Sequence, residues 1–125
     1  MEKRKRVFKN HEMGTVQDFK ELLNRAAEKY GDKVAFEYKE DSNNKKSKII
    51  KKTFNQYKKD AEYLGTKLLK MGLDGKRIAL IGPNRYEWCV SYISVVAGDM
   101  VIVPLDKALP DVEIKSLIKR SKADA

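Results

Sequence analysis

The best candidate for a ligand site in this sequence of 125 residues is the turn Gly82-Pro83-Asn84-Arg85. It follows the apolar run 78–81 and precedes a segment with helical periodicity, and the N–H groups at such a helix start often bind phosphate in α/β proteins. The turn lacks the glycines of a dinucleotide fingerprint and the Gly-Lys-Ser/Thr ending of a P-loop, and its proline and arginine would obstruct a phosphate. The pattern therefore favours a structural turn in which Asn84 caps the next helix, with phosphate binding as the alternative.

Paired carboxylates, a nucleophile and a metal site are the other chemistries to consider. Asp99, Asp106 and Asp111 lie at an expected strand start, strand end and helix start, where aspartate commonly caps or meets solvent. Cys89 lies in an apolar helical segment with no histidine near, which is typical of an inert buried thiol, and the single histidine, His11, has no partner. We therefore predict no catalytic residue and no metal ligand. The larger aromatic residues are interpreted as core and interface side chains: Tyr57, Tyr63, Tyr86, Trp88 and Tyr92.

The positive charge is concentrated in two segments. The chain has 27 Lys and Arg against 18 Asp and Glu, a net charge of +9. Residues 1–10 and residues 39–52 each carry +4, and the remaining 101 residues carry +1. This distribution indicates a solvated tail and loop, with a weak contact to nucleic acid or an anionic membrane surface as the alternative, and no specific nucleic-acid partner is predicted.

The cellular compartment is constrained by the cysteine count and by the apolar segments. One cysteine excludes an intrachain disulfide, which favours a reducing compartment. The basic start is not followed by the apolar run of a secretory signal. The most apolar stretch, 86–103, contains Glu87 and Asp99 and is not expected to cross a membrane. We expect a soluble, cytoplasmic protein.

The first half of the chain predicts a helix, a hairpin and a second helix. Apolar residues at helical spacing indicate a helix over 16–30, with Thr15 as N-cap. Alternation over 33–38, a polar loop over 39–47 and a return strand over 48–53 indicate a hairpin. Thr53 and Gln56 form a capping-box pair that opens a helix ending at Met71 and Gly72.

The second half predicts a parallel sheet. The apolar run 78–81, after Arg77, is typical of a strand buried on both faces, and a helix from Asn84 to Gly98 and a strand over 100–104 follow. Pro110 is expected as the first residue of a last helix, which turns Ile114, Leu117 and Ile118 inward. The fold class is thus α/β: an N-terminal helix and β-hairpin, then β-α-β-α of a parallel doubly wound sheet.

This sheet is expected to be incomplete. A helix after a parallel strand normally returns the chain to another strand, but the sequence stops at residues 121–125. We expect a basic flexible tail over 1–14 and, over 15–125, the truncated N-terminal part of a larger domain. An open sheet edge also predicts self-association through that edge.

The runs 77–88 and 101–106 carry a family resemblance. They resemble the N-terminal end of the AMP-forming acyl-CoA synthetases of the adenylate-forming superfamily, and the likeness covers about residues 15–125. The form Asn84-Arg85-x-Glu87-Trp88 resembles the long-chain fatty acid–CoA ligases in particular. The resemblance leaves an amino-acid- or aryl-activating relative open. A basic binding module and a scaffolding protein descended from the same fold are the alternatives from other classes.

The resemblance implies a parent enzyme that converts a fatty acid, ATP and CoA into acyl-CoA, AMP and pyrophosphate through an acyl-adenylate, with Mg²⁺ as a further cofactor. The family's Thr/Ser/Gly-rich phosphate loop, its nucleotide motifs and its C-terminal lysine are not in this sequence. The chain alone is therefore expected to be inactive and to bind no cofactor, with the remainder of the parent as its partner. In some relatives a basic residue of the loop 106–109 lies near the CoA phosphates; Ala108 matches that position, and the adjacent Lys107 is the one candidate contact.

Overall fold

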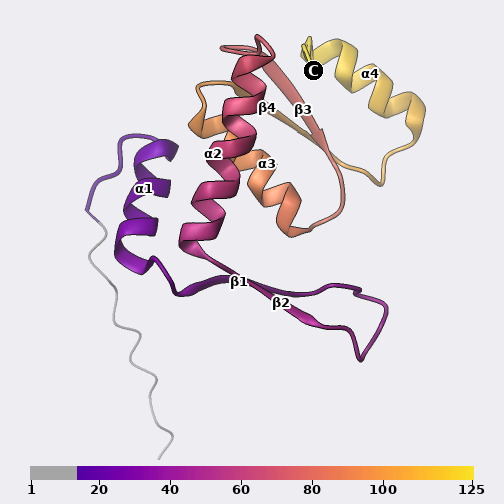
Figure 1. Cartoon of the computed structure of the whole chain (residues 1–125). Coiled ribbons are helices and arrows are strands. Elements are labelled where there is room, and N and C mark those ends of the chain that lie inside the picture. The colour runs from indigo at the N-terminus through magenta and orange to yellow at the C-terminus, as the bar shows by residue number, and fades with distance from the viewer. Residues whose placement is uncertain (1–13) are drawn as a thin grey trace, which may run out of the picture.

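The computed structural model describes residues 14–125. His11 and all but the last residue of the tail predicted over 1–14 therefore lie outside the described residues. Four helices and four strands follow one another in this part of the chain (Figure 1). No helix among the described residues is long and apolar enough to cross a membrane. The elements in order are α1 (Phe19–Tyr30), β1 (Val34–Lys39), β2 (Ile49–Thr53), α2 (Phe54–Lys70), β3 (Arg77–Ile81), α3 (Tyr86–Ala97), β4 (Val101–Leu105) and α4 (Asp111–Ser121).

The hairpin and the start of α2 form as their residues predict. β1 and β2 are antiparallel, with Phe36 opposite Lys52, and the register shifts between Val34 and Phe36. The capping box at α2 is present: the Gln56 N–H donates to the Thr53 hydroxyl (3.1 Å), and the Thr53 N–H donates to the Gln56 side chain (2.9 Å). These two bonds satisfy donors that a helix start leaves free, and they fix where the hairpin joins the body.

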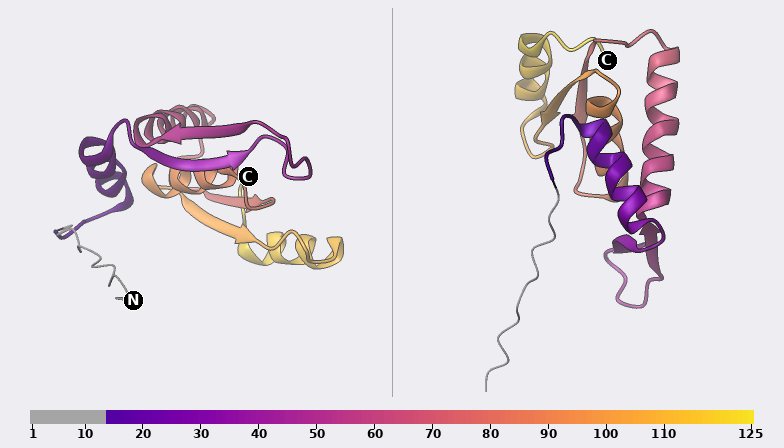
Figure 2. Two further views of the ribbon diagram at one scale, coloured as in Figure 1. Left: turned by 90° about the horizontal axis from the view of Figure 1, so that it is seen from below. Right: turned by 90° about the vertical axis from the view of Figure 1, so that its left-hand side faces the viewer.

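The sheet of the second half is parallel and is covered on both faces. β3 and β4 pair in parallel from Arg77 opposite Val101 to Ile81 opposite Leu105. Figure 2 shows α4 on the opposite side of these strands from α2 and α3. Helices on both faces of a parallel sheet define the doubly wound α/β class, so the predicted fold class is confirmed.

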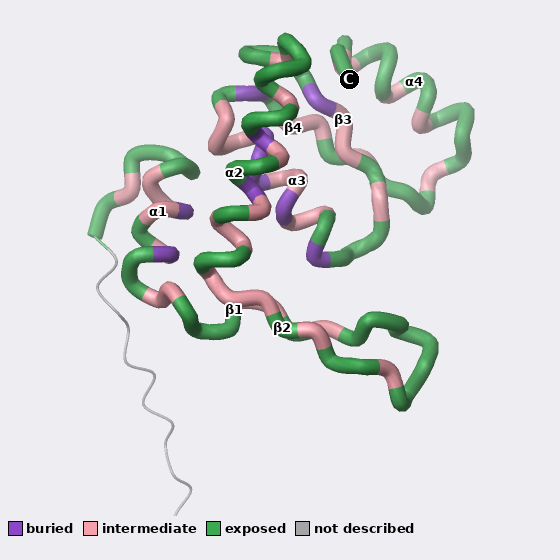
Figure 3. The backbone as a smooth tube through the Cα atoms, viewed as in Figure 1, coloured by how far each residue is buried: buried purple, intermediate pink, exposed green. Residues whose placement is uncertain are grey.

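The core lies between the helices and one face of this sheet (Figure 3). One cluster joins Leu23 of α1, Ala61 of α2 and Ile93 of α3. A second joins Ile78 of β3, Val95 of α3 and Met100, which precedes β4. Burial of these side chains is the main stabilising term, and α1, α2, α3 and β3 all contribute to it.

Three predicted helix starts are wrong. Asp18, not Thr15, is the N-cap of α1, because its carboxylate accepts the Glu21 N–H at 2.7 Å and a carboxylate is a favourable N-cap. At α3 the N-cap is Arg85 instead of Asn84, and no side chain caps that helix. At α4, Pro110 is the N-cap itself and the helix begins one residue later.

The expected burial of the second half is also wrong in part. Of the five residues in β3, only Ile78 is buried, although the strand was expected to be buried on both faces. No residue of α4 is buried, and Ile118, predicted to point inward, remains 37% exposed. The physical reason is that a sheet of two strands is too narrow to cover a helix that lies across it.

Candidate functional site

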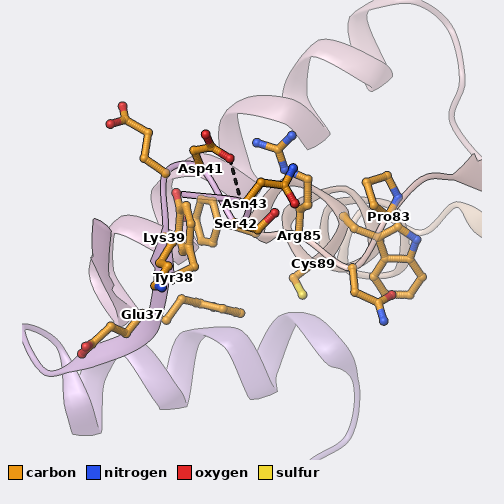
Figure 4. Close-up of a pocket in the computed structure, with 14 residues that line it drawn as sticks. Glu37, Tyr38, Lys39, Asp41, Ser42, Asn43, Pro83, Arg85 and Cys89 are labelled. Carbon is orange, nitrogen blue, oxygen red and sulfur yellow. Dashed lines mark hydrogen bonds between the residues drawn. The ribbon is translucent and has the colours of Figure 1, made fainter. Parts of the chain in front are cut away.

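A large concave surface lies between the hairpin and the turn after β3. It is a cleft of about 890 Å³. Figure 4 shows hairpin residues such as Tyr38 and Asp41 on one side and Pro83, Arg85 and Cys89 on the other. The carboxyl end of a parallel strand and the start of the next helix therefore form one wall of the cleft, which is where α/β proteins commonly place ligands.

Tyr86, the first residue of α3, fixes the hairpin against the body of the protein. Its ring is buried and stacks on Tyr38, with centroids 5.9 Å apart and planes at 13°, and it meets Phe36 edge-on at 5.1 Å. Its hydroxyl donates a hydrogen bond of 2.8 Å to Asp60 Oδ2 in α2. Lys52 Nζ of β2 lies 3.8 Å from the same oxygen and 5.3 Å from the Tyr86 ring centroid. One residue thus joins α3, α2 and both strands of the hairpin.

Near the cleft, two tyrosine hydroxyls act as hydrogen-bond donors, and Cys89 lines the cleft wall. The Tyr57 hydroxyl donates to the Cys89 carbonyl at 3.1 Å, and burial raises the pKa of Tyr57 to about 12, so this donor stays protonated at neutral pH. Burial, with the hydrogen bond to Asp60 next, also raises the pKa of Tyr86 above its usual value. Cys89, expected to be buried, is only half-buried and lines the cleft, because the groove beside α3 leaves that side of the helix open.

The turn Gly82-Pro83-Asn84-Arg85 was the first candidate for phosphate binding. Its one cation, Arg85, already forms an ion pair within the protein. Arg85 Nε lies 3.4 Å from Glu87 Oε2, and Glu87 is the second residue of α3. Asn84 and Arg85 are both exposed. A phosphate at this turn would compete with the Glu87 carboxylate for the guanidinium, which favours the structural interpretation of the turn.

The remaining predicted candidates are not brought together. Asp99 precedes β4 and Asp106 follows it, so the strand separates them, and Asp111 begins α4. The Ala108 N–H donates to Asp106 Oδ1 at 2.8 Å, which closes the turn that presents Lys107 to solvent. Within residues 14–125, no group of three His, Cys, Asp or Glu side chains is placed to hold a metal ion.

Sequence reasoning missed the contacts that Lys52 and Asp60 make with Tyr86. The available signal was weak. Lys52 alternates onto the same face of the hairpin as Phe36, its partner in the register, and a charged residue at such a position needs a counterion. Asp60 lies within the first two turns of α2, close enough to provide it.

The doubly wound sheet, with its strand-turn-helix wall along a cleft, places the chain among α/β proteins whose ligands bind beside strand ends. Residues 23–125 match the model of the AMP-binding enzyme family, and the chain belongs to that family. The family assignment confirms the resemblance to the adenylate-forming superfamily. No curated protein sequence matches the chain.

Solved structures with the same fold include the N-terminal subdomain of Klebsiella oxytoca NpsA (TM-score 0.73, 15% identity, 86% of this chain and 26% of that one). CmiS6 gives a TM-score of 0.72 at 16% identity, over 91% of this chain and 29% of that one. Klebsiella oxytoca NpsA in complex with 3-hydroxyanthranilyl-AMSN gives 0.73 at 14% identity, over 87% and 21%. At these identities the likeness concerns the fold, and the chain spans about a quarter of the length of these structures.

Proposed function

We propose that the chain is the N-terminal part of an AMP-forming ligase that activates a long-chain fatty acid and transfers it to CoA. The observation that carries this proposal is the family match over residues 23–125. The class of acid is proposed from the run Asn84-Arg85-Tyr86-Glu87-Trp88, which resembles the long-chain ligases and spans the end of the turn after β3 and the first residues of α3. The proposed location is the cytoplasm, where ATP and CoA are available.

In the proposed reaction, the fatty acid carboxylate attacks the α-phosphate of Mg²⁺-bound ATP to give an acyl-adenylate and pyrophosphate. The CoA thiol then attacks the acyl carbon, loses its proton and displaces AMP. Positioned cations and backbone N–H groups must neutralise the charge that develops on the phosphate. We infer that residues 14–125 do not supply these groups, because Arg85, the cation at the turn after β3, is exposed and paired with Glu87.

The part of this chain in the proposed enzyme is therefore structural. We infer that ATP and Mg²⁺ bind to the remainder of the parent, with β3, β4 and their helices as its supporting sheet. Lys107, exposed in the loop between β4 and α4, is proposed to contact a CoA phosphate. A single exposed lysine supplies one cation to that contact, so other residues of the parent must complete it.

A second candidate is a parent that activates an aryl acid. The observation in its favour is the likeness in fold to Klebsiella oxytoca NpsA in complex with 3-hydroxyanthranilyl-AMSN. That likeness is weaker support than the motif at Asn84–Trp88, because proteins with one fold often act on different acids.

The test begins with the DNA that follows the Ala125 codon. We expect it to continue into a Gly/Thr/Ser-rich loop, and we expect the longer protein to catalyse ATP–pyrophosphate exchange with palmitate. Anthranilate serves as the matched control acid. Exchange with anthranilate in place of palmitate would contradict the long-chain assignment, and a stop codon directly after Ala125 would contradict the ligase parent and favour a scaffolding protein.

A further inference from the structure

The connection between α2 and β3 contains Asp74-Gly75, and no other aspartate or asparagine of the chain is followed by glycine. The Lys76 N–H donates to the Leu73 carbonyl at 3.0 Å, which closes a β-turn with Asp74 and Gly75 at its centre. Gly75 has a φ of +64°, and a positive φ at this position is typical of a type II turn. Asp74 and Gly75 are both exposed, so solvent reaches the bond between them (Figure 3).

The turn leaves two groups that can react with each other without a partner. Among the described residues, neither the Gly75 N–H nor the Asp74 carboxylate makes a hydrogen bond or an ion pair. A Cβ added at Gly75 would meet nothing within 4 Å, so no neighbouring group of the protein covers this peptide bond. Because glycine has no side chain, the carboxyl group can approach the amide nitrogen without steric hindrance.

Most other aspartates have an engaged carboxylate. Asp41 Oδ1 accepts the Asn43 N–H at 2.9 Å, and Asp106 Oδ1 accepts the Ala108 N–H at 2.8 Å. The carboxylates of four further aspartates also accept hydrogen bonds: Asp18, Asp32, Asp60 and Asp124. Each of these aspartates is followed by a residue with a side chain, which crowds the next amide nitrogen. Asp74 therefore differs from them both in its neighbour and in its lack of partners.

We propose that Asp74-Gly75 is a modification site, at which aspartate converts to isoaspartate with water as the only co-reactant. The Asp74 carboxylate takes up a proton from solvent, and the Gly75 amide nitrogen attacks Cγ to form an N–Cγ bond. The nitrogen loses its proton and Cγ loses a hydroxyl group, so one water leaves and a five-membered succinimide remains. Water then opens the ring. Attack at Cγ restores aspartate, and attack at the Asp74 backbone carbonyl gives isoaspartate, in which the main chain runs through Cβ and Cγ.

The isoaspartate lengthens the main chain by one methylene group inside the turn, which separates the Lys76 N–H from the Leu73 carbonyl. Leu73 packs against the core cluster that includes Met100, and the Lys76 carbonyl accepts the Val101 N–H at 2.9 Å. The modification therefore loosens the connection at the point where β3 and β4 begin. It also leaves a free α-carboxylate, which is the group that an isoaspartyl methyltransferase methylates.

The test is incubation of the purified full chain at neutral pH and physiological temperature. Isoaspartyl methyltransferase and S-adenosylmethionine with a labelled methyl group then report isoaspartate. We expect label to accumulate in the peptide that contains residues 74 and 75. Asp74→Glu should lower that labelling by about tenfold or more, because its ring would have six members. Asp41→Glu, the matched change at another exposed aspartate, should leave it unchanged. Label that is absent from the incubated chain, or equal in Asp74→Glu, would overturn the proposal.

A second measurement follows the turn itself. In the isoaspartyl fraction of the incubated chain, we expect amide hydrogen exchange at Lys76, measured by NMR, to be about tenfold or more faster than in the unmodified fraction. Equal rates in the two fractions would show that the turn survives the modification and that the proposed loosening is wrong. Neither measurement involves ATP or a fatty acid, so the proposal stands or fails independently of the proposed ligase activity.

Discussion

Replacing Tyr86 with alanine is expected to lower the free energy of unfolding by about 3–5 kcal/mol, the range for removing a large buried aromatic side chain. The ring is only 8% exposed, and it packs on Phe36 and Tyr38 of the hairpin. Without it, the hairpin loses its main contact with α3, and the Asp60 carboxylate loses its hydroxyl donor. Urea unfolding followed by circular dichroism measures the change.

Two variants separate the parts of this effect. Tyr86→Phe keeps the ring and removes the hydrogen bond to Asp60, and it should cost about 1–2 kcal/mol. Tyr63→Ala removes the same side chain from a position that is 66% exposed, and the change should stay within about 0.5 kcal/mol. Equal losses for Tyr86→Ala and Tyr63→Ala would show that Tyr86 does not anchor the hairpin.

Leu23→Ala is expected to destabilise the protein by about 2–5 kcal/mol, because it leaves a cavity where α1 meets α2 and α3. Leu23 is 8% exposed and belongs to the cluster with Ala61 and Ile93. Leu23 and Ala27 are the only buried residues of α1, so the contact of this helix with the body depends on them. Amide exchange in α1 should accelerate more than exchange in α3.

The matched variant for this prediction is Leu69→Ala in α2. Its side chain is 41% exposed, so the same truncation should cost less than about 1 kcal/mol. If Leu69→Ala were as damaging as Leu23→Ala, or if exchange in α1 were unchanged in Leu23→Ala, the proposed attachment of α1 would be wrong.

The sequence predicted most elements of the fold because their signals are local. The spacing of Thr53 and Gln56 predicted the start of α2, and the unbroken apolar run over 78–81 predicted β3. The strand-helix order then predicted the parallel pairing. Periodicity and capping act within one or two turns of chain, so a single sequence contains the information.

The errors arose where two neighbouring residues could take the same role, or where distant parts of the chain decide the outcome. Either Thr15 or Asp18 could cap α1, and the carboxylate at Asp18 won through its bond to Glu21. Burial of Ile118 depends on the width of the sheet beneath α4, which no local pattern specifies. The same holds for the bonds between β3 and residues Asp124 and Ala125, which lie 46 to 48 positions further along the chain.

The candidate site was less predictable than the fold. Sequence patterns identified the turn at Asn84 and the loop at Lys107, but the cleft depends on how the hairpin folds over α3. That arrangement is fixed by Tyr86, Asp60 and Lys52, which come from three separate elements. Only their three-dimensional positions show that an aromatic residue at a helix start holds the hairpin in place.

ATP–pyrophosphate exchange by the purified 125-residue chain tests the central claim most directly. The claim is that this member of the AMP-binding enzyme family contributes part of a ligase's fold, and that the groups acting on ATP belong to the remainder of the parent. With ATP, Mg²⁺, labelled pyrophosphate and palmitate, we predict exchange no greater than in a control without protein. Exchange above that control, abolished by heating the chain, would contradict the claim.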